Sequence, residues 1–148
     1  CVSTDLFSKK TYAQPIKNKR PDAVLQAAMS DWLRNPCLPQ SVLMDNGCEF
    51  ASLSRFCEEK GIKVYRSPAY HPQTNGECEN RNRTIKSRLK LLSGFVNWDR
   101  HLPYVIHQMN AAKHSVTKLT PFEIEFGYEG ESPTDPYRRL PKKQEINL

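Results

Sequence analysis

An apolar run, a helical segment and a second apolar run succeed one another between positions 41 and 66. The first run, Ser41 to Met44, shows no alternation with polar residues, as expected for a strand covered on both faces. A helical segment at 53–60 separates it from the second run at 62–66. Because strand, helix and strand in this order favour a right-handed crossover, we expect the two strands to be parallel. Asp45 then lies at the carboxyl end of a strand, where open α/β sheets usually bind their ligands.

Turn and proline residues set the limits of the amino-terminal elements. Two β-rich runs, Cys1 to Ser8 and Thr11 to Ile16, flank a short basic turn and predict a hairpin. Pro15 indicates that the second of these strands lies at an edge of its sheet, because proline cannot donate to a ladder. Pro21 suits the first turn of an amphipathic helix, which we expect to end before Asn35.

Cap residues mark the central helix, for which Ser52 or Ser54 is the expected amino-terminal cap and Gly61 the expected stop. The chain is then expected to be helical up to about residue 126, with a short last helix from Pro121. The long helix before that should bury a stripe made of Cys78, Ile85, Leu89 and Leu92.

Length and charge limit the class of protein. The 148 residues suit one domain of ordinary size, which we place at 1–130, followed by a tail or linker rich in proline and charge at 131–148. No apolar run approaches the roughly 18 to 20 residues of a membrane span, so we expect no membrane partner. The formal charge of +6 favours an anionic partner. The five cysteines never occur as Cys-x-x-Cys, which argues against a disulfide framework and a zinc site and favours an intracellular location.

Ordered motifs carry a family resemblance along most of the chain. They are Asp45-Asn-Gly-Cys-Glu-Phe50, Gly61-Ile62 and Ala69-Tyr-His-Pro-Gln-Thr-Asn-Gly-Glu-Cys-Glu-Asn-Arg-Asn-Arg-Thr-Ile85, then Trp98, Leu102-Pro103, Asn110, His114-Ser115, Leu119-Thr-Pro-Phe-Glu-Ile124 and Gly127. Together they resemble the catalytic core of a retroviral or gypsy-type LTR-retrotransposon integrase. The resemblance implies a ribonuclease-H-like α/β fold, a mixed sheet flanked by helices. It also implies a polynucleotidyl transferase that processes and joins DNA 3′ ends as part of a retroelement polyprotein.

The resemblance also assigns residues to the site. Asp45 and Glu79 match catalytic acids of the family, and Arg83, Lys86 and Lys90 match positions that hold the phosphates of the element's DNA end. Each acid has an ordinary structural interpretation beside the functional one. Asp-Asn-Gly is a common tight-turn sequence, and Glu79 with Arg83 is a familiar i,i+4 ion pair.

Paired carboxylates point to metal chemistry. Two carboxylates about 4 Å apart repel by roughly 4 kcal/mol at a protein-like effective dielectric, so they stay ionised together only beside a cation. Hard oxygen ligands select Mg²⁺ or Mn²⁺. The resemblance implies two such ions, held by Asp45 and Glu79, that activate a water or a DNA 3′-hydroxyl and stabilise the leaving oxygen. It implies no small-molecule cofactor.

The segment Pro68 to Gly76 is expected to be a loop before a helix that opens near Glu79. Tyr70, Gln73 and Asn75 are its candidate DNA contacts, because aromatic and amide side chains can stack on or hydrogen-bond to an unpaired DNA end. The glycine and the prolines would serve as hinges. A plain surface loop whose polar groups are satisfied locally is the alternative.

The amino end departs from the family pattern. Members carry a third catalytic aspartate on a central first strand, and Cys1 to Ser8 resembles the strand after it, so the first strand is missing from this chain. Asp5 is either a substitute metal ligand or a residue of a strand end or turn. Without the central strand two sheet edges lack a partner, which is costly. We therefore expect a fragment of a longer polyprotein, or the product of a decayed or domesticated element.

Two classes of function remain open. The first is a DNA integrase core that works as a homo-oligomer on element ends and target DNA, in the nucleus at the point of action. The second is a catalytically inactive fragment, or a domesticated nucleic-acid-binding module that keeps the basic helix. An apolar strand carrying an aspartate just before Cys1 would favour the enzyme.

Overall fold

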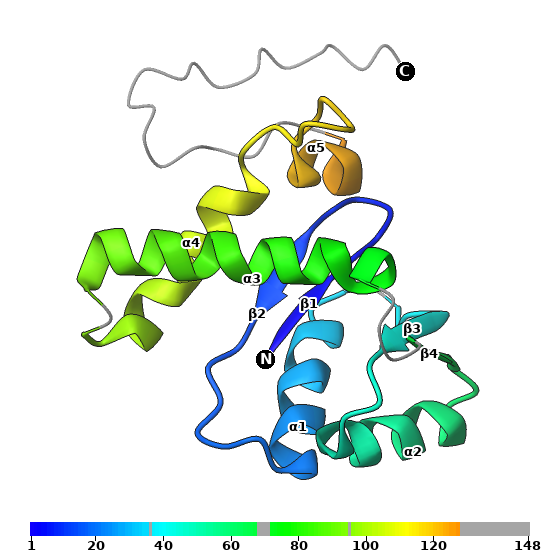
Figure 1. Ribbon diagram of the computed structural model, residues 1–148. Coiled ribbons are helices and arrows are strands. Elements are labelled where there is room, and N and C mark those ends of the chain that lie inside the picture. The colour runs from blue at the N-terminus through cyan, green and yellow to red at the C-terminus, as the bar shows by residue number, and fades with distance from the viewer. Residues whose placement is uncertain (36, 68–71, 95, 128–148) are drawn as a thin grey trace, which may run out of the picture.

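The computed structural model describes residues 1–35, 37–67, 72–94 and 96–127, without the side chains of residues 72–75 and 93. The strands are β1 (Val2–Thr4), β2 (Thr11–Ala13), β3 (Ser41–Met44) and β4 (Lys63–Arg66). The α-helices are α1 (Pro21–Trp32), α2 (Ala51–Glu59), α3 (Pro72–Ser93), α4 (Trp98–Asn110) and α5 (Pro121–Phe126), and the 3₁₀ helix η1 (Cys48–Phe50) leads into α2. In Figure 1, α3 crosses in front of the β1–β2 hairpin, and α1 and α2 lie below it.

The predicted amino-terminal hairpin is confirmed. β1 pairs antiparallel with β2, with Val2 opposite Ala13 and Thr4 opposite Thr11. The turn is basic, as the sequence indicates, and Lys9 within it takes a positive φ of 63°. The paired region is shorter than the two β-rich runs, because the chain beyond Ala13 leaves the ladder before Pro15, a residue that cannot donate to it.

The predicted parallel pair is also confirmed. β3 and β4 run parallel with Ser41 opposite Lys63, and α2 connects them. Gly61 ends the connection with a φ of +69°, a conformation that costs glycine little. The expected cap is wrong: α2 begins directly after η1 without a side-chain cap. The Ser52 hydroxyl instead donates to Asp22 of α1 at 3.0 Å.

One of the two hydrophobic cores lies between this pair and the helices α1 and α2. It contains Ala28, Met44, Leu53, Cys57 and Ile62. The expectation that both strands are covered on both faces is wrong, since Val42 and Leu43 are only half-buried and Tyr65 is 56% exposed. The reason is that only two strands pair here among the described residues, so the helices cover one face and leave the other partly open.

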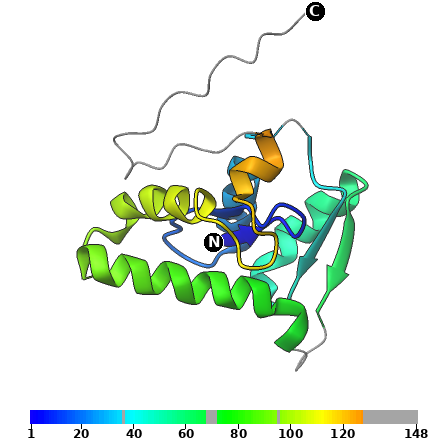
Figure 2. The same cartoon turned by 90° about the horizontal axis from the view of Figure 1, so that it is seen from above.

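The second core lies between α3, α4 and the hairpin. It contains Ile85, Leu89, Leu102, Val105 and Met109, with Val2 and Ala13 of the hairpin packed against it. The buried stripe predicted for α3 is thus confirmed at its centre. It is wrong at Leu92, which is 48% exposed because it lies in the last turn of α3, where fewer neighbours remain. Figure 2 shows α3 and α4 side by side.

The start of α3 differs from the prediction. The helix begins at Pro72, not near Glu79, so Glu79 lies in its third turn. Proline fits the first turn of a helix, where its missing N–H is not needed. Asn75 and Gly76 are poor helix formers and hid the start in the sequence, yet a Cβ at Gly76 would meet no atom within 4 Å. The expected loop can therefore include only residues 68–71, which lie outside the described residues.

The carboxyl end of α4 is joined to the hairpin by one buried side chain. Thr11 N donates to Asn110 Oδ1 at 2.8 Å, and Asn110 Nδ2 donates to Thr11 O at 2.8 Å. The amide of Asn110 thus satisfies the free edge of β2 much as a neighbouring strand would. Thr11 is fully buried and Asn110 is 4% exposed, so water does not offer these backbone groups a replacement.

The last described helix, α5, has a complete capping box. Thr120 accepts from Glu123 N, and the Glu123 side chain accepts from Thr120 N. The short helix predicted from Pro121 is confirmed, and Gly127 ends it with a φ of 72°. The tail predicted at 131–148 lies outside the described residues.

The described strands form two separate two-stranded sheets, β1–β2 and β3–β4. One is antiparallel and the other parallel, and helices flank both, so the architecture is mixed α/β as expected. No helix in the described ranges is both long and apolar enough to cross a bilayer.

Candidate active site

Asp45 lies on a turn that is fixed to both parallel strands. It follows β3 directly, and its Oδ1 accepts from Gly47 N at 2.8 Å. Arg66 at the end of β4 donates to Asp45 O at 2.8 Å, and Asn46 Nδ2 donates to Ser67 O at 3.2 Å. The Asp45 side chain is exposed, and its Oδ2 has no hydrogen-bond partner among the described residues. The tight-turn interpretation of Asp45 is therefore correct and still leaves one carboxylate oxygen available for a ligand.

A second acid, Glu49, lies on the same turn, and the sequence analysis did not single it out. A Cβ placed on Gly47 would lie 2.3 Å from Glu49 Oε2 and 3.0 Å from Asp45 Oδ1. Both carboxylates therefore converge on the space that glycine leaves open. The signal in the sequence is weak, because an acid four residues after Asp45 becomes meaningful only once η1 turns the chain back over Gly47.

Glu79 is exposed on α3, and among the described residues neither a hydrogen bond nor an ion pair engages its carboxylate. The ion pair with Arg83, the ordinary interpretation of this spacing, does not form. Arg83 instead donates to Asn80 Oδ1 at 2.8 Å. The carboxylate of Glu79 is therefore free to bind a ligand.

Glu77, two residues before Glu79, fixes the amino-terminal part of α3 to two distant segments. Its carboxylate lies 3.8 Å from Lys9 Nζ in the hairpin turn, 3.2 Å from Arg81 on α3 and 3.6 Å from His114 Nε2 after α4. Burial is the main cause that lowers the pKa of His114, and the nearby cations lower it further against the opposing effect of Glu77. The lowered pKa favours the neutral form of His114, and Lys9 and Arg81 are the cationic side chains beside Glu77.

The cations predicted to bind DNA form an exposed stripe on α3. Arg83, Lys86 and Lys90 are all exposed, whereas Ile85 and Leu89 face the second core. Lys86 and Lys90 have no ion-pair partner in the described part of the chain. The structure thus gives these side chains the exposure that their predicted role requires, and the role itself stays a prediction.

The three loop candidates are not placed by the structure. Tyr70 lies outside the described residues, and Gln73 and Asn75 belong to the first turns of α3 with side chains outside the description. Their contact with DNA therefore stays a prediction.

Asp5 organises the hairpin turn. Its Oδ2 accepts from the backbone N–H of Ser8 at 2.8 Å and from the Ser8 hydroxyl, and its Oδ1 accepts from Phe7 N at 3.4 Å. Burial alone would raise the pKa of Asp5, but the hydrogen bonds from Ser8 and Phe7, with the charge of Lys9, outweigh it and hold the pKa below its usual value. These contacts agree with the interpretation of Asp5 as a turn residue. The role of Asp5 as a metal ligand stays a prediction.

We expect Asp5→Asn to destabilise the chain by about 1 kcal/mol at pH 5 and by less at pH 2.5, measured by urea unfolding. A carboxylate whose pKa is lower when folded stabilises the fold above its unfolded pKa of about 4, and this contribution disappears as the pH falls through the folded pKa. Ser8→Ala removes one donor and should reduce the same pH-dependent difference. An equal deficit of Asp5→Asn at both pH values would show that the charge is not involved.

The described residues contain no group of three or more His, Cys, Asp or Glu side chains placed to hold a metal ion. Asp5, Asp45 and Glu79 therefore do not form a three-acid cluster in this structure. Asp45 and Glu79 nevertheless offer exposed carboxylate oxygens, the donor type that Mg²⁺ and Mn²⁺ prefer. The residues present fit a divalent ion in chemistry and supply part of its ligand set.

Comparisons with known proteins define the class of the fold. Residues 1–72 match the family described as integrase core domain. The HTLV-2 integrase catalytic core domain, solved in complex with magnesium in a trimeric form, superposes with a TM-score of 0.69 at 20% identity, covering 83% of this chain and 81% of that one. A chain of the simian T-cell lymphotropic virus intasome, solved in complex with PP2A regulatory subunit B56 gamma, gives a TM-score of 0.74 at 18% identity over 94% of this chain and 50% of that one. The fold is therefore that of the ribonuclease-H-like integrase catalytic cores.

The comparison of sequences agrees with the comparison of folds. The Pro-Pol polyprotein of simian foamy virus type 1 is 31% identical over 136 residues, which is 89% of this chain. The match to the integrase core domain and this relative confirm the resemblance seen in the motifs of the chain. The chain spans only 12% of that polyprotein's length.

Proposed function

We propose that this chain is the catalytic core of a DNA integrase, a polynucleotidyl transferase that trims the 3′ ends of a retroelement and joins them to target DNA. One observation carries the proposal: two exposed acids with available carboxylate oxygens occur on two fixed supports, Asp45 on the strand-end turn and Glu79 on α3. α3 also presents Arg83, Lys86 and Lys90 to solvent. One acid for the reaction, Glu79, and the cations for its substrate therefore share one helix.

The cations of α3 bind and orient the DNA. Arg83 to Lys90 spans seven residues, or about 10 Å of helix, which exceeds the roughly 3.4 Å that separates charges along one DNA strand. The stripe therefore contacts more than one phosphate and fixes the direction of the strand relative to Glu79. Neutralising phosphates releases counterions, so the binding weakens as salt increases.

The acids hold the metal. Asp45 and Glu79 bind divalent Mg²⁺ or Mn²⁺, two ions in our proposal, through oxygens that the fold leaves unpaired. When bound, such ions activate a water or a DNA 3′-hydroxyl and stabilise the leaving oxygen of an in-line displacement. The Arg66 guanidinium donates to Asp45 O and Gly47 N donates to Asp45 Oδ1, and these two hydrogen bonds keep the Asp45 turn in place, so this acid needs no reorganisation when the ion arrives.

Assembly on DNA is part of the same proposal. The similar structures are a trimeric core and an intasome, and by analogy we propose that this chain acts as a homo-oligomer on element ends and target DNA. Its place of action is then the nucleus, where target DNA lies.

A second function rests on a specific observation. Since the described residues bring no three metal-binding side chains together, the chain could serve as a catalytically inactive module that binds nucleic acid through α3. Such a module would keep the salt-dependent DNA binding and lack the metal-dependent reaction.

A strand-transfer and disintegration assay separates the two functions. We expect labelled DNA to be joined, or a branched DNA to be resolved, in Mn²⁺ and not after chelation with EDTA. The assay uses residues 1–148 and, in parallel, the same chain extended by any residues that its gene encodes upstream of Cys1. Activity in either form supports the integrase. DNA binding by both forms without any metal-dependent reaction would favour the inactive module.

A further inference from the structure

A second cluster of cations lies on the loop between β2 and α1. Lys17, Lys19 and Arg20 fall within four residues, and all three side chains are exposed. No ion pair or side-chain hydrogen bond engages these cations in the part of the chain that the structure describes. Three unpaired charges so close together repel one another, which favours an anionic partner.

The backbone of this loop is held in place. Arg20 N donates to Asn18 Oδ1 at 3.1 Å, and Val24 N donates to Arg20 O at 3.1 Å. The first bond closes a tight turn between the cations, and the second ties the loop to the first turn of α1. The three side chains therefore extend from a fixed backbone, which lowers the entropy cost of ordering the loop around a ligand.

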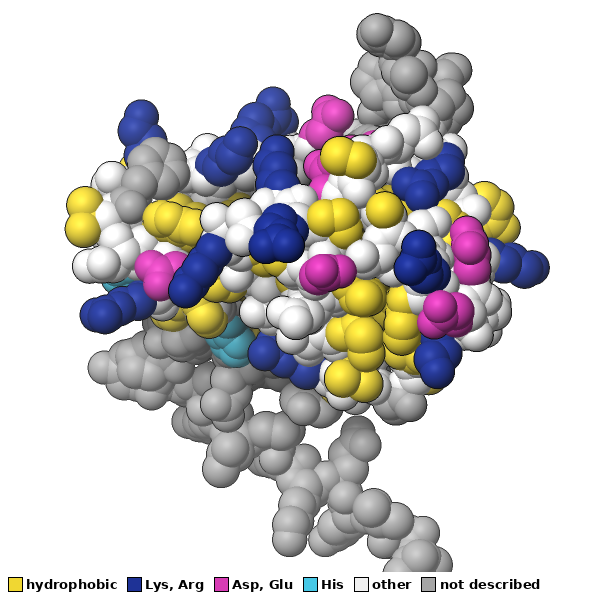
Figure 3. Space-filling model, turned by 90° about the horizontal axis from the view of Figure 1, so that it is seen from below, with side chains coloured by type: hydrophobic (Ala, Val, Ile, Leu, Met, Phe, Trp, Pro, Cys, Tyr) yellow, Lys and Arg dark blue, Asp and Glu magenta, His cyan; other side chains and the backbone are white. Residues whose placement is uncertain are grey.

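The loop continues from β2, which packs against the same core as α3. Ala13 packs against the core that contains Ile85 and Leu89 of α3, and Lys17 follows Ala13 by four residues. In Figure 1 the loop runs below the hairpin, and Figure 3 shows Lys and Arg side chains spread over the whole face of the molecule seen from below. The loop and α3 are thus both joined to the second core, the loop through β2 and α3 through its buried face.

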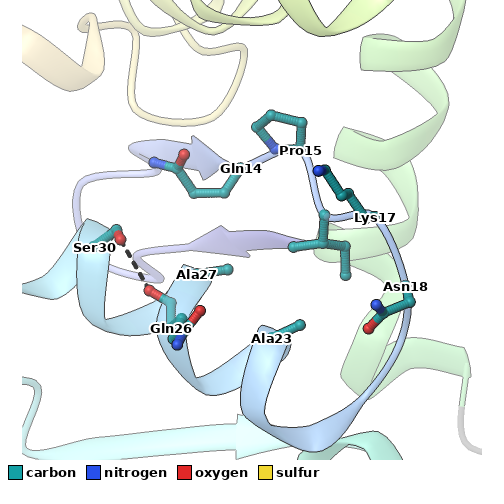
Figure 4. A pocket seen from close by; sticks show the side chains of 9 residues that line it. Gln14, Pro15, Lys17, Asn18, Ala23, Gln26, Ala27 and Ser30 are labelled. Carbon is teal, nitrogen blue, oxygen red and sulfur yellow. Dashed lines mark hydrogen bonds between the residues drawn. The ribbon is translucent and has the colours of Figure 1, made fainter.

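A hollow of about 360 Å³ separates the loop from α1, as Figure 4 shows. Polar side chains line it from both sides: Gln14 and Asn18 from the loop, Gln26 and Ser30 from α1. None of its lining residues is aromatic. Proteins that bind single-stranded nucleic acid rely on aromatic side chains on which bases stack, so this surface suits a phosphate backbone and not unstacked bases.

We propose that Lys17, Lys19 and Arg20 form a second contact with the backbone of duplex DNA, which extends the binding surface of α3 onto the β2–α1 loop. This inference rests on the proposed function, because it assigns a further part of the same substrate. Its chemistry is that of phosphate neutralisation without base readout, so it adds affinity and not sequence preference.

The salt dependence of binding tests the proposal. Each neutralised phosphate contributes about 0.9 to the slope of log affinity against log salt. The combined variant Lys17→Ala, Lys19→Ala, Arg20→Ala should lower that slope by about 2 to 3 for duplex DNA. The slope is measured by fluorescence anisotropy at salt concentrations from about 50 to about 200 mM. Folding is checked by circular dichroism, since all three residues are exposed.

The matched control removes the same charge elsewhere. Lys60, Lys63 and Lys113 are exposed, and replacing all three by alanine also removes three charges from the net +6. We expect this control to leave the slope nearly unchanged. Equal slopes for the two triple variants would overturn the inference, because net charge alone would then explain the loss. An equal loss of slope on a single-stranded oligonucleotide would overturn the assignment to duplex DNA.

A third variant separates this inference from the proposed function. Replacing Arg83, Lys86 and Lys90 by alanine should also lower the slope. A loss in the α3 variant without a loss in the loop variant would overturn the second contact and leave the proposed function standing. Absence of any DNA binding by the unaltered chain would overturn both.

Discussion

Replacing Asp45 by asparagine is expected to lower strand transfer by at least about 100-fold while DNA binding stays unchanged. Loss of an outer-shell partner of a metal ligand already costs about 10- to 100-fold, so the loss of a ligand itself should cost more. Asparagine keeps the acceptor for Gly47 N, so the turn should survive. The product is measured in single-turnover assays in Mn²⁺, in whichever form of the chain is active.

The control for this variant is Asp99→Asn, which removes an exposed acid in the first turn of α4. We expect it to keep full activity, whereas Glu79→Gln should resemble Asp45→Asn. Full activity of Asp45→Asn with unchanged metal dependence would mean that other groups hold the ion. Glu49, whose carboxylate also lies over Gly47, would then be the next residue to replace.

Replacing Asn110 by leucine is expected to destabilise the fold by about 3 kcal/mol. The substitution preserves the size of the side chain but leaves Thr11 N and Thr11 O buried without partners, and each unpaired buried group costs about 1 to 3 kcal/mol. For a domain of about 150 residues this corresponds to a fall in Tm of roughly 6 to 12 °C. The free energy is measured by urea unfolding and the Tm by differential scanning calorimetry.

Gln108→Leu is the matched control on the same helix. Gln108 donates to Tyr104 in an exposed hydrogen bond, so its loss should change the free energy of unfolding by less than about 0.5 kcal/mol. If Asn110→Leu were as mild as Gln108→Leu, the two buried backbone groups of Thr11 would have found other partners.

Local patterns in the sequence predicted the elements that depend on near neighbours. The apolar run before Asp45 and the stop at Gly61 were enough to predict the parallel pair, because strand, helix and strand leave few alternative arrangements. The start of α3 was missed because Asn75 and Gly76 lower helix propensity locally, whereas packing along the rest of the helix decides its length.

Local sequence patterns did not predict the contacts between segments that are distant in the sequence. Asn110 contacts Thr11 across 99 positions of the sequence. The family motif includes Asn110 but does not indicate that the Asn110 amide binds the backbone at the edge of β2. Nothing in the sequence distinguishes Glu77 from the other acids near it, because its contacts with Lys9 and His114 form only when the chain is folded. In the site, the sequence predicted Asp45 and Glu79 but not Glu49, whose position depends on the turn of η1.

The two candidate catalytic acids are supported by different hydrophobic cores. Asp45 follows Met44, which belongs to the core of α1, α2 and β3, whereas Glu79 is carried by α3, whose Ile85 and Leu89 belong to the other core. The separation of the two carboxylates is thus set by how one packed half of the molecule sits against the other. A ligand that bridges both acids would act as a clamp between the halves, so hydrogen exchange should slow at their junction when metal and DNA bind.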